Sequence, residues 1–240
     1  MRIVAVAAPG SRTLLSAALP HGTDPHLLLS ERGFRVRRLL SATRVDGEIV
    51  VTAEVFRRRP KARPRVPGRV RTIDLGVDIE LGQSVPKRQR VAAYAIVLSD
   101  LGILATQFSH RTAVPGLWGL PGGGVDADEQ PGAAVLREIG EETGQEAIID
   151  HILDLQTDHW IGRSPSGEIE DFHAVRIIYA AFCQAPTTPI VHDIGGTTAS
   201  TRWIRLSNWR RTQWSAGFRM LLDRHLDALT ANTRVRRSAS

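Results

Sequence analysis

The sequence has a single cysteine, Cys183, among 240 residues, and aromatic residues make up only 5% of it. One thiol excludes a disulfide-stapled secreted scaffold and a zinc site built from cysteines. No apolar run approaches the roughly 18 residues of a membrane span, so we predict no membrane contact. After Met1 and Arg2, the apolar stretch 3–8 ends at Pro9 and is too short for the hydrophobic part of a secretory signal. We therefore expect a cytoplasmic protein.

The positive charge of the chain is concentrated in one segment. Hydrophobic residues (42%) and charged residues (23%) are in the range of a globular protein with a core, and the net charge is +6. Residues 57–71 hold eight basic residues, three prolines and no acid, and removing those eight charges from +6 leaves −2. Proline and like charges favour an extended linker, for which we take residues 57–86. A polyanion such as RNA is the alternative partner, but the segment has no aromatic residue for base stacking.

Residues 1–56 are predicted to form a small α+β unit. Asp46-Gly47 between two apolar-rich segments is a strong two-residue hairpin signal, and Thr23 or Asp24 can cap a short helix. No catalytic constellation is apparent in this unit, so we expect a packing or substrate-rim role. The resulting ββαββ order consists of strands at 3–8 and 13–19, a helix from Pro25 that ends before Gly33, and strands at 34–45 and 48–56.

Residues 87–229 are predicted to form a second domain, followed by a frayed tail at 230–240. A closing helix at 216–229 has one apolar face made of Phe218, Leu221, Leu222, Leu226 and Leu229. Strands are expected at 91–98, 102–108, 117–120, 148–156, 172–183 and 201–204, and a further helix at 131–143.

The helix at 131–143 has an unfavourable distribution of charge. Pro131 at its start and Gly144 after its end are the favoured terminal residues. Glu138, Glu141 and Glu142 share a face, although like charges at these spacings each cost roughly 0.2–0.5 kcal/mol. A divalent cation would remove the conflict, since carboxylate oxygens are hard ligands that suit Mg²⁺ or Mn²⁺. We expect the inward stripe of this helix to be Ala133, Leu136, Ile139 and Thr143.

A glycine-rich loop precedes this helix, and loop and helix together resemble the signature of a known family. Three glycines at 122–124 let backbone groups approach a phosphate or metal closely. The segment from Gly123 to Gln145 is similar to the Nudix box of the Nudix hydrolases, with one departure at Gln145, where the pattern prefers an aliphatic residue. The eight defined positions are Gly123, Glu129, Arg137, Glu138, Ile139, Glu141, Glu142 and Gly144.

The resemblance implies a fold, a reaction and a set of roles. The fold would be an α/β/α sandwich with a mixed sheet, and the reaction would be hydrolysis of a diphosphate linked to another moiety, typically a nucleoside, with Mg²⁺ or Mn²⁺. Glu138, Glu141, Glu142 and the main-chain oxygen of Gly122 would hold the metal. Glu129 and Arg137 would pair to fix the loop against the helix.

Two assignments stay open within this resemblance. The general base is either Glu138 or a group in or just after the later loop 162–171, which offers Glu168, Glu170, Asp171 and then His173. A nucleobase could stack on Trp118, Trp160 or Phe172. We take Trp118, Trp160 and Glu170 as candidate substrate-binding residues.

The substrate is left open between a nucleoside triphosphate, an oxidised nucleotide and a nucleotide sugar. One alternative is a regulatory protein that keeps the Nudix fold as a ligand sensor, although such a protein is expected to lose box carboxylates, and all are present here. The other is an RNA 5′-end pyrophosphohydrolase that uses the basic linker. The sequence also leaves a homodimer open.

Overall fold

The computed structural model describes residues 1–57, 72–73, 84–164, 167–193 and 195–238. The chain divides into two compact units. Unit 1 comprises Met1–Ala93, Gly124–Ala134 and His151–Ile178, and unit 2 comprises Tyr94–Gly123, Val135–Asp150 and Tyr179–Ser240. This division does not follow the domain boundaries expected from the sequence, which stay a prediction. Most of the expected basic linker, at 58–71 and 74–83, lies outside the described residues.

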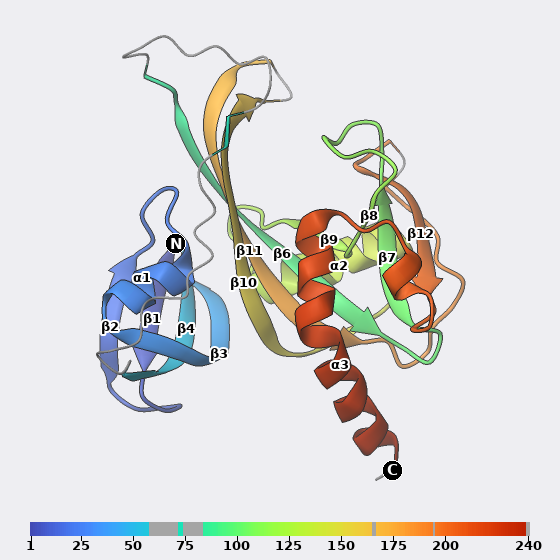
Figure 1. Ribbon diagram of the computed structural model, residues 1–240, viewed down its shortest axis with the longest axis horizontal. Helices are drawn as coiled ribbons and strands as arrows, with labels where there is room; N and C mark the ends of the chain where they lie inside the picture. The colour runs from blue at the N-terminus through green and yellow to red at the C-terminus, as the bar shows by residue number, and fades with distance from the viewer. Residues whose placement is uncertain (58–71, 74–83, 165–166, 194, 239–240) are drawn as a thin grey trace. The chain divides into compact units, whose positions relative to one another are not determined.

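The N-terminal part of unit 1 is a four-stranded mixed sheet with one helix, in the predicted ββαββ order (Figure 1). The strand order is β2-β1-β4-β3, with β1 parallel to β4. Asp46 and Gly47, with φ of 47° and 77°, form the predicted two-residue turn. The elements are β1 (Arg2–Val6), β2 (Thr13–Ala18), α1 (Pro25–Glu31), β3 (Phe34–Val45) and β4 (Glu48–Arg57).

Asp24 is the residue that caps α1. Its Oδ1 accepts hydrogen bonds from the backbone N–H groups of His26 (2.8 Å) and Leu27 (3.0 Å). Its other carboxylate oxygen accepts from the Thr157 hydroxyl at 3.1 Å. One side chain therefore satisfies two N–H groups that the helix leaves without partners and also binds a later strand of unit 1.

The rest of the chain forms an eight-stranded mixed sheet with the order β12-β7-β6-β11-β10-β5, in which β8 pairs with β7 and β9 with β6. A mixed sheet combined with the helices α2 and α3 is the α/β architecture that the sequence predicts. The strands are β5 (Thr72–Ile73), β6 (Lys87–Leu98), β7 (Ile103–Phe108), β8 (Trp118–Gly119), β9 (Gly122–Gly124), β10 (Ile148–Arg163), β11 (Ile169–Phe182) and β12 (Thr198–Ile204); the helices are α2 (Pro131–Thr143), the 3₁₀ turn η1 (Trp209–Arg211) and α3 (Ala216–Ser238).

Several details differ from the expected elements; for example, β6 begins at Lys87 instead of residue 91, and β10 continues to Arg163 instead of residue 156. Within the expected linker, β5 pairs in parallel with β10. A short strand, β9, forms at the glycines, although glycine has little preference for strands. Helix α3 continues to Ser238 instead of ending at Leu229, because the sequence after Leu229 contains no glycine or proline to stop it.

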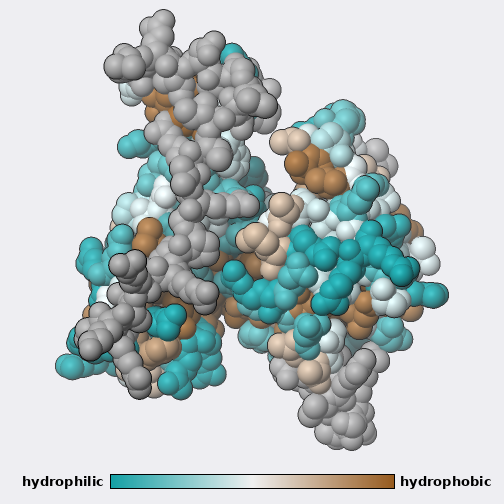
Figure 2. All heavy atoms as spheres, in the orientation of Figure 1, coloured by the Kyte–Doolittle hydropathy of each residue, from teal (hydrophilic) through white to brown (hydrophobic). Residues whose placement is uncertain are grey.

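The predicted apolar face of α3 is confirmed. All five of its residues are buried, and hydrophilic side chains cover much of the surface over this helix (Figure 2). On the outer side, Arg219 and Asp223 form an i, i+4 ion pair at 3.0 Å. Among the described residues, no helix combines the length and the apolar character that crossing a membrane requires.

The turn between β6 and β7 requires glycine at position 102. Gly102 has φ of +128°, and an added Cβ would lie 2.8 Å from the carbonyl carbon of Ile204. Gly116 also has a positive φ, +80°, but a Cβ there would have nothing within 4 Å. Both glycines belong to unit 2, so they form a matched pair.

We expect Gly102→Ala to destabilise the protein more than Gly116→Ala. The change at Gly116 should cost about 1–2 kcal/mol of conformational strain. The change at Gly102 should cost about 1–3 kcal/mol more, because a backbone segment has to move. Urea unfolding of both variants measures the difference, and equal losses would show that the close approach to Ile204 does not constrain the turn.

Candidate functional site

The three glutamates of α2 differ in their exposure to solvent. The helix spans the predicted residues, Pro131–Thr143. Glu142 is buried, with 6% of its surface exposed. The side chain of Glu138 is 18% exposed and that of Glu141 is 49% exposed. The helix therefore points one carboxyl into the protein, one along its surface and one toward solvent.

The predicted inward stripe of α2 is partly wrong. Ile139 and Thr143 are buried as expected, but Ala133 and Leu136 are exposed. The buried face is rotated so that it contains Glu142, which has hydrogen-bond partners elsewhere in unit 2. The residues buried on this face are Pro131, Ala134, Val135, Ile139, Glu142 and Thr143.

The buried carboxyl of Glu142 is held from two sides. The backbone N–H of Gly122 in β9 donates to its Oε2 at 3.0 Å, and the hydroxyl of Thr198 in β12 donates to its Oε1. Burial raises the pKa of Glu142 to about 7, although both hydrogen bonds act in the opposite direction. The negative charges of Glu138 and Asp193 raise it further. A positive charge nearby would therefore stabilise the charged form of Glu142 and lower its pKa.

The glycine at position 123 makes room for a second carboxyl. A Cβ at Gly123 would lie 2.6 Å from the Cδ of Glu138, so a larger residue would displace that carboxyl group. Arg137 donates to Glu138 Oε1 at 3.1 Å and to Glu141 Oε2 at 3.0 Å. The glycine loop and one arginine therefore hold the two more exposed carboxyls.

The carboxylate oxygens of these three side chains are the kind of ligand that a hard divalent cation takes, although the three side chains point in different directions. Three carboxyl groups lie on one helix, one of them with a raised pKa that a bound cation would lower. Oxygen ligands of this kind suit Mg²⁺ or Mn²⁺. The carbonyl of Gly122 as a further ligand stays a prediction, and so does the Glu129–Arg137 pair. Glu129 Oε2 accepts a hydrogen bond from the backbone N–H of Asp126 at 3.2 Å.

Gln145, where the sequence departs from the Nudix pattern, is buried and hydrogen-bonded. Its Oε1 accepts from the backbone N–H of Thr187 at 2.9 Å, and its Nε2 donates to the hydroxyl of Thr187 at 2.8 Å. The amide therefore packs the chain after α2 against residues near the end of β11, without entering the cluster of glutamates.

The three candidate substrate-binding residues lie in different units. Trp118 is in unit 2, where it lines an open cavity of ≈ 450 Å³ together with Arg202 and Arg211. The guanidinium of Arg202 lies 4.0 Å from the centre of the Trp118 ring. Trp160 and Glu170 are in unit 1. Their substrate-binding roles stay predictions.

The two candidates in unit 1 have partners of their own. The Trp160 ring packs against Phe172 with the ring centres 4.7 Å apart, and the carboxylate of Glu170 lies 3.7 Å from the guanidinium of Arg88. Glu170 and Asp171 are part of strand β11, rather than of the loop expected at 162–171. A general base from this region stays a prediction.

Arg44, at the end of β3, is not among the predicted site residues. Its side chain donates to the carbonyls of Asp126 and Glu129, both at 3.0 Å. Its backbone N–H donates to Gln130 Oε1 at 2.8 Å, and Gln130 Nε2 donates back to its carbonyl at 3.2 Å. The N-terminal sheet thus holds the loop that joins the glycines to α2. Arg44 and Gln130 are 86 positions apart in the sequence, so local patterns do not reveal this contact.

The raised pKa of Glu142 predicts how stability depends on pH without metal. Because the folded protein keeps the Glu142 proton up to about pH 7, instead of the ordinary value of 4.5, the free energy of unfolding should fall as pH rises between these values. Glu142→Gln should remove this fall and raise stability above pH 7. Urea unfolding in EDTA at about pH 5 and about pH 8 measures both. An unchanged pH dependence in the variant would assign the fall to another group.

Comparison with known proteins supports the assignment of this region to one family. The family model described as NUDIX domain matches residues 88–222, more than half of the chain. The nucleoside triphosphatase NudI of Klebsiella pneumoniae (strain 342) is 33% identical over 79 residues, 32% of this chain and 56% of that protein. The NudI of Salmonella typhimurium (strain LT2) is 30% identical over 95 residues, 38% of this chain and 67% of that protein.

The similarity to these relatives covers part of their length, a little over half in the Klebsiella protein. Among solved structures, the MutT protein from Methanosarcina mazei Go1 superimposes with a TM-score of 0.47 at 22% identity. That superposition covers 59% of this chain and 95% of the other.

Proposed function

Because this chain belongs to the Nudix family, we propose that it is a metal-dependent hydrolase of a diphosphate linkage in a nucleoside diphosphate derivative. The observation that carries the proposal is the set of carboxyls on α2 under the glycine loop. One of them, Glu142, is buried between Gly122 and Thr198. Burying Glu142 is unfavourable for its charged form, as the raised pKa shows, and a bound cation would offset this cost.

In this proposal Glu138, Glu141 and Glu142 hold Mg²⁺ or Mn²⁺. When bound, the cation lowers the pKa of water and neutralises charge on the phosphate oxygens. Glu138 accepts the proton of the attacking water, because it is the half-buried carboxyl next to the glycine loop. Arg137 orients Glu138 and Glu141 through its two hydrogen bonds. A water oxygen forms a bond to phosphorus while the P–O bond to the leaving phosphate breaks.

A nucleoside triphosphate is the substrate class that we favour. The NudI proteins of Klebsiella and Salmonella, which match this chain at 30–33% identity, are named as nucleoside triphosphatases. The glycine-rich loop suits a polyphosphate chain, since its backbone can approach phosphate oxygens closely. An oxidised nucleotide and a nucleotide sugar are the competing substrates in the test below.

The proposal predicts metal-dependent release of phosphate or pyrophosphate from a panel of nucleoside triphosphates, oxidised nucleotides and nucleotide sugars. Turnover should need Mg²⁺ or Mn²⁺ and stop in EDTA. Glu142→Gln should lower kcat/KM by at least on the order of 100-fold. Losing a residue that only supports a metal ligand already costs about 10–100-fold, and Glu142 is proposed to be a ligand itself.

The same panel separates the enzyme from a ligand sensor. If no member is turned over but one raises the melting temperature in a metal-dependent way, the protein is a sensor built on the Nudix fold. If turnover survives in Glu142→Gln, the α2 carboxyls are not the metal site.

Arg44 is predicted to be a positioning residue for this reaction. Arg44→Ala removes the hydrogen bonds to the carbonyls of Asp126 and Glu129, so the loop before α2 should lose its fixed position. We expect kcat to fall about 10-fold or more, since a misplacement of about 1 Å can cost 10²-fold. The matched control is Arg35→Ala, which removes an exposed arginine from the same strand and should leave kcat unchanged. Equal effects of the two changes would show that Arg44 acts only through charge.

A further inference from the structure

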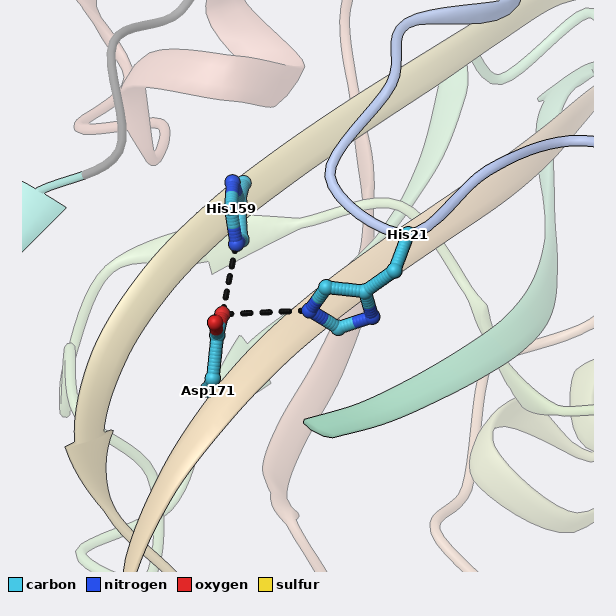
Figure 3. Close-up of side chains that lie close together, drawn as sticks. All are labelled: His21, His159 and Asp171. Carbon is cyan, nitrogen blue, oxygen red and sulfur yellow. Dashed lines mark hydrogen bonds and ion pairs between the residues drawn. The ribbon is translucent and has the colours of Figure 1, made fainter. Parts of the chain in front are cut away.

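Unit 1 contains a cluster of metal-ligating side chains, made of His21, His159 and Asp171 (Figure 3). The Nε2 atoms of His21 and His159 lie 3.1 Å and 2.6 Å from the same atom, Asp171 Oδ1. His21 follows β2, whereas His159 and Asp171 belong to β10 and β11. Each residue offers a ligand atom within 4.8 Å of the other two.

The backbone around the cluster is shaped for this approach. Gly22 has φ of +73°, and a Cβ there would lie 2.6 Å from Cε1 of the His159 ring. Only glycine therefore lets the turn after His21 pass so close to that imidazole. Asp171 is buried, and its backbone N–H donates to the carbonyl of Pro86 at 2.8 Å. This hydrogen bond fixes the backbone of Asp171, and the turn at Gly22 brings His21 next to the Asp171 carboxylate.

A third histidine next to the cluster has an unused nitrogen. His173 is fully buried, and its Nε2 is the single buried side-chain nitrogen or oxygen without a hydrogen-bond partner among the described residues. Its Nδ1 is 2.8 Å from Gln89 Nε2. The rings of His21 and His159 lie edge-on to it, with centres 5.5 Å and 5.8 Å away.

We propose that His21, His159 and Asp171 form a binding site for a zinc-class transition metal, separate from the glutamates of α2. Two imidazoles and one carboxylate are a ligand set typical of Zn²⁺ with an open fourth position. Two ligand atoms of a tetrahedral Zn²⁺ site are about 3.3 Å apart. The His21 distance of 3.1 Å is close to this spacing, whereas the His159 distance of 2.6 Å has to lengthen when the metal binds. A metal-bound water in the fourth position gives His173 Nε2 the hydrogen-bond partner it lacks.

The two metal sites of the chain differ in the chemistry of their ligands. Carboxylates alone favour Mg²⁺ or Mn²⁺, whereas imidazole nitrogens favour Zn²⁺, Co²⁺ and their neighbours in the transition series. The proposed site also joins the turn after β2 to the β10–β11 pair, so metal binding should stabilise unit 1. The proposal does not depend on the hydrolase activity, because the two sites share no residue.

The alternative for the same geometry is a metal-free tie, in which both imidazoles donate a hydrogen bond to Asp171. His26 offers an example of such a contact in the same unit, with its Nε2 3.3 Å from Asp154 Oδ1. Metal binding requires a lone pair on each Nε2, whereas the tie requires a proton on each Nε2. A metal titration therefore separates the two arrangements.

The test is a titration of the full-length, metal-stripped protein with Co²⁺ in excess Mg²⁺, followed by visible absorption. Four-coordinate Co²⁺ with nitrogen ligands absorbs strongly, whereas six-coordinate Co²⁺ on oxygens absorbs weakly. We expect strong bands that saturate at one equivalent and disappear when Zn²⁺ is added. His21→Ala should abolish them, and the matched control His26→Ala should leave them unchanged.

A further variant tests the glycine next to the site. Gly22→Ala should weaken Co²⁺ binding at least 10-fold, because the new methyl group displaces the His159 ring. Circular dichroism in EDTA checks that each variant folds. Weak six-coordinate bands in the wild-type protein would overturn the proposal whether or not the variants fold, and so would strong bands that persist in a folded His21→Ala protein.

Discussion

The buried carboxyl of Glu142 sets the arrangement of the proposed catalytic region. Burying a carboxyl group without hydrogen-bond partners is costly, and here the partners are the N–H of Gly122 and the hydroxyl of Thr198. Placing Glu142 between β9 and β12 fixes the rotation of α2, which turns Leu136 outward and leaves Glu138 next to Gly123. The glycines, the helix and the last strand of the sheet are thus linked through one buried carboxyl group. Its cost appears in the raised pKa, which a bound cation would relieve.

The N-terminal sheet and its helix, for which the sequence indicates a packing or substrate-rim role, make contacts with the rest of unit 1 at two places. Arg44 binds the backbone of the loop before α2, and His21 joins His159 at Asp171. The two proposed sites differ in their ligands and therefore in the metals that they favour: carboxylate oxygens on α2, and two imidazole nitrogens with one carboxylate in unit 1. In these proposals, the chain binds Mg²⁺ or Mn²⁺ for hydrolysis, and a separate transition metal links the turn after β2 to strands β10 and β11.

Local signals in the sequence predict local structure well. Asp46-Gly47 identifies its hairpin, Pro131 and Gly144 mark the ends of α2, and the apolar spacing identifies the buried face of α3. Features that depend on distant partners escape such signals. Periodicity favours apolar residues for the inner face of α2, yet Glu142 is buried there because Thr198, 56 residues away, can donate to it. His21 and Asp171 are 150 residues apart, so spacing does not relate them.

The central claim is that the carboxyls of α2 hold the divalent cation that hydrolysis requires. Anomalous diffraction at the manganese edge from crystals soaked in Mn²⁺ tests it directly. The account predicts a manganese peak bounded by the carboxylates of Glu138, Glu141 and Glu142, which disappears in crystals of Glu142→Gln. A wild-type protein that turns over a nucleotide with Mn²⁺ but has its manganese peak elsewhere, away from α2, would contradict the account.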